Sequence, residues 1–274
     1  MKNKNSKAIQ QLITWLAIFL NLLIFIHCKD SQSPNLNAVV ALYSDQGCWD
    51  ESVQAAEKMF EWMGLTVARV NADYINSKGL DNFSMLCIPG GDMYQYARDL
   101  SSSGKNKIIN FISNGGGYIG ICGGAYFAAE KVYWQGAQLA MISLALYSGS
   151  AYGPNNEIVP YKDYGMSRVN IVNFTHPITQ SESSFAWMLY YWGPVLIPDN
   201  SADVTILARY DNGNQPAMLA FEYDLGRVFL IGTHPEIEED DDRDGVDWGD
   251  ELDDNGSDWE LMKNAAFWCL ENNI

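Results

Sequence analysis

The chain has 274 residues, of which 47% are hydrophobic and 13% aromatic. This length suits one large domain or two small ones, and the composition is ample for a packed core. The formal net charge is −17, and no basic stripe offsets it, which argues against nucleic acid as a partner. The five cysteines show neither metal-ligand spacing nor an even disulfide framework.

The first 28 residues have the pattern of an export signal. Lysines at positions 2, 4 and 7 precede an almost wholly apolar run over residues 12–26. This run of about 15 residues is short for a membrane span, which needs about 20. Cys28 follows where bacterial lipoproteins carry their acylated cysteine, but His27 stands where they prefer a small residue. We predict an exported protein with a signal peptide or membrane anchor at 1–28 and a linker at 29–37, and lipidation, an uncleaved anchor and secretion all stay open.

From residue 38 onward the pattern alternates between short apolar runs and amphipathic segments. Alternating strands and helices predict an α/β domain over residues 38–274 with a mostly parallel sheet, whose reactive groups gather beyond the carboxyl ends of its strands. The loops at residues 44–49 and 90–96 fall at that edge. The predicted strands are 38–43, 66–70, 85–88, 118–121 and 226–232, and the predicted helices are 51–63, 105–113 and 259–270.

Between residues 135 and 216 the pattern loosens into short β-like pieces rich in Tyr, Gly and Pro. Residues 157–161 and 168–172 are two of them. The run at 204–210 is predicted to pair with 217–223 as a hairpin across a turn that contains Asn-Gly. This region predicts an antiparallel extension of the sheet.

A cysteine bracketed by glycines follows the apolar run at 118–121. Cys122 stands between this run and residues 125–130, which can continue as a helix, so the order is strand, sharp turn, helix. Such a turn exposes its central side chain at the carboxyl end of a strand, and the following helix N-terminus favours a thiolate there. Cys122 is therefore a candidate nucleophile. The alternative is a structural cysteine buried in a Gly-rich turn.

The strand predicted at 226–232 delivers a histidine and a glutamate. A thiol nucleophile needs a base, and the base needs a third group to orient its ring. His234 and Glu236 suit these two roles, whereas the chain's other histidines, His27 and His176, lie in the N-terminal apolar run and in a probable turn. The alternative is a histidine that merely ends a strand.

Three motifs in this order resemble the class I glutamine amidotransferases. Residues 120–124 look like their nucleophile elbow, residues 234–236 like their His-x-Glu pair, and residues 86–92 like the strand and Pro-Gly-Gly loop that supplies an oxyanion amide. Closer still is the family of the biotin-protein ligase N-terminal domain. The resemblance implies a flavodoxin-like three-layer sandwich. Its implied site residues are Cys122 as nucleophile, His234 as base, Glu236 as orienter, and Gly91 and Gly123 as oxyanion donors.

The same resemblance implies a substrate pocket. Residues 190–194 look like the segment that lines the pocket of that family, and the implied pocket residues are Asp92, Tyr126, Trp192 and Gly193. An ordinary aromatic core is the alternative. The expected substrate is a small-molecule or peptide amide, with no organic cofactor and no synthase domain in this chain. A non-catalytic tethered binding module of the same fold stays open as a second function.

The acidity is concentrated near the C-terminus, where residues 236–260 hold 14 acidic residues and one arginine. Counted from Asp240, the segment fits the calcium-loop pattern of alternate carboxylates, a turning glycine at position six and a closing glutamate at position twelve. A solvated acidic loop is the alternative, and a structural calcium-dependent surface protein is a third functional hypothesis. The predicted calcium ligands are Asp240, Asp242, Asp244, Val246 and Glu251.

Overall fold

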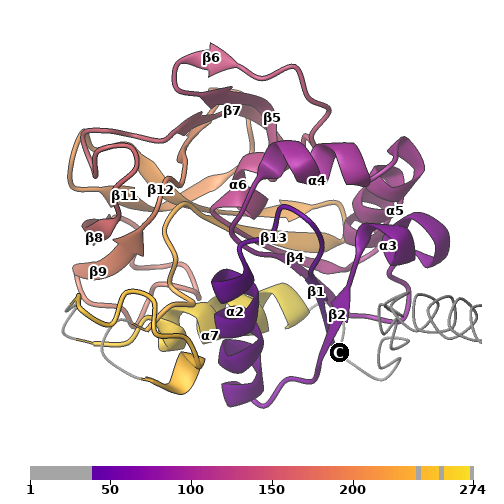
Figure 1. Cartoon of the computed structure of the whole chain (residues 1–274), viewed down its shortest axis with the longest axis horizontal. Coiled ribbons are helices and arrows are strands. Elements are labelled where there is room, and N and C mark those ends of the chain that lie inside the picture. Colours follow the sequence, from indigo (N-terminus) through magenta and orange to yellow (C-terminus); the bar gives the residue numbers. More distant parts are fainter. Residues whose placement is uncertain (1–38, 239–241, 253–255, 272–274) are drawn as a thin grey trace, which may run out of the picture. The chain divides into compact units, whose positions relative to one another are not determined.

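The computed structural model describes residues 39–238, 242–252 and 256–271. In these residues a nine-stranded sheet has the order β2-β1-β3-β4-β13-β12-β11-β8-β9 (Figure 1). The strands from β2 to β13 are parallel, and the remaining four extend the sheet in antiparallel fashion. The bounds are β1 Val40–Tyr43, β2 Val67–Val70, β3 Met85–Ile88, β4 Gly117–Ile121, β8 Gly165–Ile171, β9 Phe185–Tyr190, β11 Thr205–Tyr210, β12 Pro216–Tyr223 and β13 Gly226–Ile231.

Helices cover both faces of this sheet (Figure 1). Helices α2 and α7 bury side chains in one hydrophobic core, and α3, α4, α5 and α6 contribute to a second. The predicted three-layer α/β sandwich, with a mostly parallel sheet and an antiparallel extension, is confirmed. The helix bounds are α2 Asp50–Trp62, α3 Ala72–Lys78, α4 Met93–Asp99, α5 Ser102–Ser113, α6 Gly123–Ala128 and α7 Trp259–Leu270.

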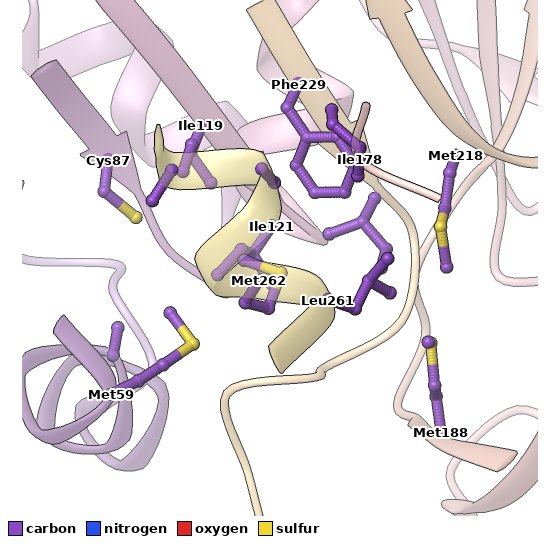
Figure 2. Packing of buried hydrophobic residues seen from close by; sticks show 14 of the residues in the cluster. Met59, Cys87, Ile119, Ile121, Ile178, Met188, Met218, Phe229, Leu261 and Met262 are labelled. Atoms are coloured by element: carbon purple, nitrogen blue, oxygen red, sulfur yellow. The ribbon is translucent and has the colours of Figure 1, made fainter. Parts of the chain in front are cut away.

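The hydrophobic core between α7, α2 and the sheet is closely packed and leaves the face of the sheet inaccessible to a substrate. Met262 of α7 and Met59 of α2 are fully buried in one cluster with Ile119 of β4 (Figure 2). Cys87 of β3 and Cys269 of α7 are also fully buried and pack as small hydrophobes. Because layers of helices cover both faces of the parallel strands, chemistry is left to the loops beyond their carboxyl ends.

A smaller sheet, in the order β10-β7-β5-β6, follows α6 in the chain. The loosened pattern of this region gave no indication of a separate sheet. Because β5 begins at Ala129, the helix predicted to continue through residue 130 ends at Ala128 instead. The bounds of the smaller sheet are β5 Ala129–Trp134, β6 Ala137–Gln138, β7 Tyr147–Gly153 and β10 Val195–Pro198.

Two local predictions are wrong. Residues 157–161 form turns rather than a strand, and Asn155 and Asn156 accept backbone N–H groups there. The loop expected at 90–96 gives way to α4 at Met93. The reason is Asp92, whose Oδ1 accepts the N–H groups of Tyr94 and Gln95 and so caps the helix.

The N-terminal predictions lie outside the described residues. They comprise the signal or anchor at 1–28, the linker at 29–37 and lipidation of Cys28. Among the helices that the structure describes, none combines the length and hydropathy needed to cross a bilayer.

Candidate active site

The turn that holds Cys122 has the strained geometry of a nucleophile elbow. Cys122 follows β4 with φ of 45° and ψ of −99°, and its N–H donates to the Ile231 carbonyl of β13 at 2.9 Å. A non-glycine residue at such a φ costs about 1–3 kcal/mol and persists only where its surroundings fix it. Glycine is required beside it, because a Cβ on Gly124 would lie 2.0 Å from the Ile88 carbonyl oxygen. The predicted strand, sharp turn and helix are all present.

His234 and Glu236 lie just after β13 and interact through their side chains. His234 Nδ1 is 2.9 Å from Glu236 Oε1, and the two side chains are 1% and 0% exposed. The His234 N–H donates to the Leu189 carbonyl at 2.8 Å, which fixes the backbone below the ring. Nε2 is buried and has no hydrogen-bond partner among the described residues, so it is the ring nitrogen left for the Cys122 thiol.

Ser52, in the first turn of α2, supports this pair. Its hydroxyl donates to Glu236 Oε1 at 2.5 Å and accepts the Gly90 N–H at 2.8 Å. Ser52 is fully buried. The serine therefore connects the carboxylate to the loop that follows β3. No sequence pattern indicated this role, because a serine in the first turn of a helix is ordinary.

The electrostatics of His234 follow from its neighbours. Burial lowers the pKa of His234, but the charges of Cys122 and Glu236, together with the hydrogen bond to Glu236, outweigh burial and raise this pKa to about 10. In general an imidazolium favours the thiolate form of a neighbouring cysteine, and the thiolate is the reactive form of a cysteine nucleophile.

The backbones of Gly91 and Gly123 meet next to Cys122. A Cβ on Gly123 would lie 2.4 Å from the Gly91 carbonyl oxygen and 2.8 Å from its nitrogen. Gly91 also has φ of 143°, which side chains rarely tolerate. Within the described part of the chain, the amide of neither glycine donates a hydrogen bond. Two such amides are available to a developing oxyanion.

These residues open onto a cavity of about 450 Å³. The structure places Asp92, Tyr126 and Trp192 on its wall. Gly193 is not among the lining residues and packs instead against Gly232, where a Cβ would lie 1.6 Å from the carbonyl oxygen. The lining comprises Trp49, Gly91, Asp92, Met93, Tyr94, Cys122, Tyr126, Trp134, Leu139, Tyr191, Trp192 and His234.

Four aromatic residues on this wall were not predicted individually, namely Trp49, Tyr94, Trp134 and Tyr191. Tyr191 lies within residues 190–194, which the resemblance implied as pocket-lining. Trp49 and Tyr94 fall within the two stretches expected at the sheet edge, so their position was available from the strand order. Trp134 belongs to β5, in the smaller sheet. No sequence pattern indicated that Trp134 lines the cavity, because its position depends on packing between that sheet and the helix at Cys122.

The acidic segment has internal partners in the structure. Asp244 is fully buried, and its carboxylate accepts the N–H groups of Val246 at 3.0 Å and Glu238 at 2.9 Å. Glu251 accepts a hydrogen bond from the Tyr164 hydroxyl. Asp240 lies outside the described residues. Among the residues described, no group of three or more His, Cys, Asp or Glu is placed to hold a metal ion, and calcium binding stays a prediction.

The same segment packs against the candidate site through Trp248. The Trp248 ring lies 4.6 Å from that of Trp49 and 4.9 Å from that of Tyr191, measured between centroids. Trp49 in turn meets the His234 ring edge to face at 4.9 Å. Packed aromatic rings therefore connect the acidic segment to His234, from Trp248 through Trp49.

A model of the family described as "Biotin-protein ligase, N terminal" matches residues 38–255, which include Cys122, His234 and Glu236. The chain belongs to this family. A curated relative of this chain is an uncharacterized protein of Chlamydia muridarum, 29% identical over 181 residues, which are 63% of this chain and 68% of the relative. The biotin-protein ligase of Schizosaccharomyces pombe is 27% identical over 166 residues, 56% of this chain. The match spans 26% of that ligase.

The fold of this biotin-protein ligase N-terminal domain also occurs in solved structures. A glutamine amidotransferase from Thermotoga maritima superposes with a TM-score of 0.59 and 13% identity, over 86% of this chain and 99% of the other. At that identity the likeness shows the fold alone. The predicted membership of the amidotransferase-like superfamily is confirmed at the level of fold.

Replacing Ser52 tests the support of the buried pair. Ser52→Ala removes a hydrogen bond to Glu236 and leaves the Gly90 N–H unsatisfied, so we expect a loss of about 1–3 kcal/mol in the free energy of unfolding. Ser77→Ala is the control, because Ser77 is exposed on α3 and its hydroxyl donates only to carbonyls there. Urea denaturation measures both. Equal effects of the two changes would contradict the role of Ser52.

The pKa of His234 predicts a pH dependence. Because its folded-state pKa is about 10 and the ordinary value is about 6.5, the stabilisation is fully present below about pH 6.5 and is lost as the pH rises through about 10. Cys122→Ser removes the thiolate and should lower the pKa of His234. NMR titration of the imidazoles measures this. His176, whose pKa is lowered by burial and by Arg227, is the internal control. An ordinary pKa for His234 in the unchanged protein would contradict the prediction.

Thermal melting tests the calcium loop. One site occupied at 100 times its dissociation constant stabilises the fold by about 2.7 kcal/mol. We expect calcium to raise the melting midpoint, and Asp242→Ala or Glu251→Ala to remove most of the gain. Asp73→Ala, at an exposed position on α3, should leave the gain intact. A midpoint that is the same in calcium and in a chelator would identify a solvated acidic loop.

Proposed function

We propose that this protein is an exported, membrane-associated hydrolase of the amidotransferase type, with a Cys-His-Glu triad that acts on an amide or acyl substrate. The observation that carries the proposal is the buried contact between His234 and Glu236 beside a cavity that Cys122 also lines. The raised pKa of His234, to about 10, supports an imidazolium next to Cys122. The strained turn at Cys122 supports a nucleophile, because such strain persists where function requires it.

The proposed reaction proceeds in two halves. The Cys122 thiolate attacks the carbonyl carbon, and the Gly91 and Gly123 amides stabilise the oxyanion. His234 gives its proton to the leaving amine or alcohol, and a thioester forms. Water then attacks the thioester while His234 takes a proton, so that a carboxylic acid leaves and the Cys122 thiolate returns. Glu236 holds the ring and stabilises the imidazolium in both halves.

A second candidate is a tethered binding module that keeps the fold and the cavity without turnover, with a structural calcium loop. One observation favours it. The Cys122 Sγ donates to the Tyr191 carbonyl oxygen at 3.6 Å, so the sulfur already has a partner within the protein. The two candidates differ in whether Cys122 is reactive.

Alkylation by iodoacetamide, followed by mass spectrometry, separates these candidates. We expect Cys122 to react at least about tenfold faster than Cys48, because burial raises the pKa of Cys48 to about 11. His234→Gln should slow the labelling of Cys122 and leave that of Cys48 unchanged. Cys87 and Cys269 are buried and serve as unreactive controls. Labelling of Cys122 no faster than that of Cys48 would rule out the hydrolase and leave the binding module.

Export has its own test. Residues 1–37 fused to a reporter enzyme should carry it out of the cytoplasm of a bacterial host, and deletion of residues 12–26 should prevent this. A shortened chain that begins at Pro34 should fold with the same thermal midpoint as the full chain, because β1 begins at Val40. Retention of the intact fusion in the cytoplasm would overturn the export proposal.

A further inference from the structure

The cavity beside Cys122 has an unusual wall. Half of its twelve lining residues are aromatic: Trp49, Tyr94, Tyr126, Trp134, Tyr191 and Trp192. Among the lining residues there is no lysine or arginine, and Asp92 is the carboxylate. The electron-rich faces of aromatic rings attract cations, most strongly where water is excluded. Apart from His234, which lies beside Cys122, the lining therefore contains no basic side chain.

Several of these rings are held in place before any ligand arrives. The Tyr126 hydroxyl donates to the Trp192 carbonyl at 3.0 Å, and Trp192 Nε1 donates to the Asp163 carbonyl at 3.1 Å. Trp192 also has φ of 60°, a conformation that its surroundings must impose. Trp134 packs edge to face on Tyr126 and on Trp192, at 6.0 and 6.4 Å between centroids. A pre-ordered wall loses little side-chain entropy on binding.

Asp92 places a carboxylate on the same wall, at an exposed position. Its Oδ1 accepts both capping N–H groups of α4, from Tyr94 at 2.9 Å and Gln95 at 3.3 Å. Among the described residues no hydrogen bond engages its Oδ2. The carboxylate is thus oriented by one oxygen and available through the other. Glu51 adds negative charge near Tyr191, where, after burial and Cys122, it contributes to a raised pKa of that tyrosine.

We propose that the cavity selects a positively charged acyl substrate, an amide or ester that carries an alkylammonium group. The aromatic wall and Asp92 receive the ammonium ion while the carbonyl lies at Cys122. The proposal rests on the hydrolase function above for its carbonyl chemistry, but the selection of the cation depends only on the cavity.

Three small probes of matched shape test the selection without turnover. Choline, its neutral carbon isostere 3,3-dimethylbutan-1-ol, and 3,3-dimethylbutanoate are titrated into the full chain, and tryptophan fluorescence or calorimetry reports binding. We expect choline to bind at least about tenfold more tightly than the neutral isostere, and the carboxylate more weakly than either. Choline that binds no more tightly than the isostere, including no detectable binding of both, overturns the proposal.

Variants assign the preference to this cavity. Asp92→Asn keeps a good cap on α4 but removes the charge, and Trp134→Leu removes one ring, so each should reduce the preference for choline at least about threefold. Trp134→Phe should restore part of it. Asp73→Asn and Trp187→Leu are matched controls at exposed positions that do not line the cavity, and they should have no effect. An undiminished preference in Asp92→Asn and Trp134→Leu overturns the assignment.

Turnover separates this proposal from the proposed function. If the protein hydrolyses esters, acetylcholine should have at least about tenfold higher kcat/KM than 3,3-dimethylbutyl acetate. Hydrolysis of both esters at equal rates overturns the selection and keeps the hydrolase. Tight choline binding that persists in Cys122→Ala, with no reactivity at Cys122 in the unchanged protein, overturns the hydrolase and keeps the cation site.

Discussion

The buried carboxylate of Glu236 is the interaction on which the rest of the site depends. A carboxylate removed from water costs several kcal/mol unless partners compensate it. Here the partners are His234 at 2.9 Å and Ser52 at 2.5 Å, and Ser52 also holds the Gly90 N–H. One carboxylate therefore brings together the end of β13, the start of α2 and the loop after β3. The position of the histidine ring is a consequence of this shared anchor, and the loop that presents Gly91 is fixed by it as well.

The sequence predicted the parts of this site that are local. A parallel sheet has buried runs of apolar residues, and each run at Met85–Ile88, Gly117–Ile121 and Gly226–Ile231 is recognisable within a few residues of its true bounds. Cys122 and His234 follow two of those runs directly. Because β4 and β13 are neighbouring parallel strands, they end at the same edge of the sheet. The strand order alone therefore suffices to bring Cys122 and His234 to one edge.

The parts that escaped prediction depend on tertiary packing. A serine near the start of a helix is common, and the role of the Ser52 hydroxyl follows only from its tertiary hydrogen bond to Glu236. Trp134 lies in the smaller sheet, whose strands are short and pair with partners distant in the sequence. Such a sheet has weak local signals, because cross-strand neighbours rather than periodicity stabilise it. The capping of α4 by Asp92 was readable in principle, but the Pro-Gly-Gly stretch before it indicated a loop.

Aromatic contacts connect the acidic segment to the chemistry. Trp248 touches Trp49, and Trp49 touches His234, so the path from the segment to the imidazole consists of ring contacts. Movement of Trp248 would change the packing around His234 directly. This contact route exists whether or not a cation binds the segment, because it depends on apolar packing and not on charge.

The net charge of the acidic segment has little effect on proton transfer between the Cys122 thiol and the His234 imidazole, although the charge is large. Residues 236–260 carry 14 acidic side chains and one arginine. A negative potential from these residues favours the His234 imidazolium, but it opposes the Cys122 thiolate by a similar amount. Transfer of a proton from the thiol to the imidazole creates a pair with no net charge, and a potential that is uniform over the pair leaves that equilibrium unchanged. Only groups much nearer to one member than to the other can bias it. Glu236, in hydrogen-bond contact with the ring, is such a group, because it lies against the imidazole of His234.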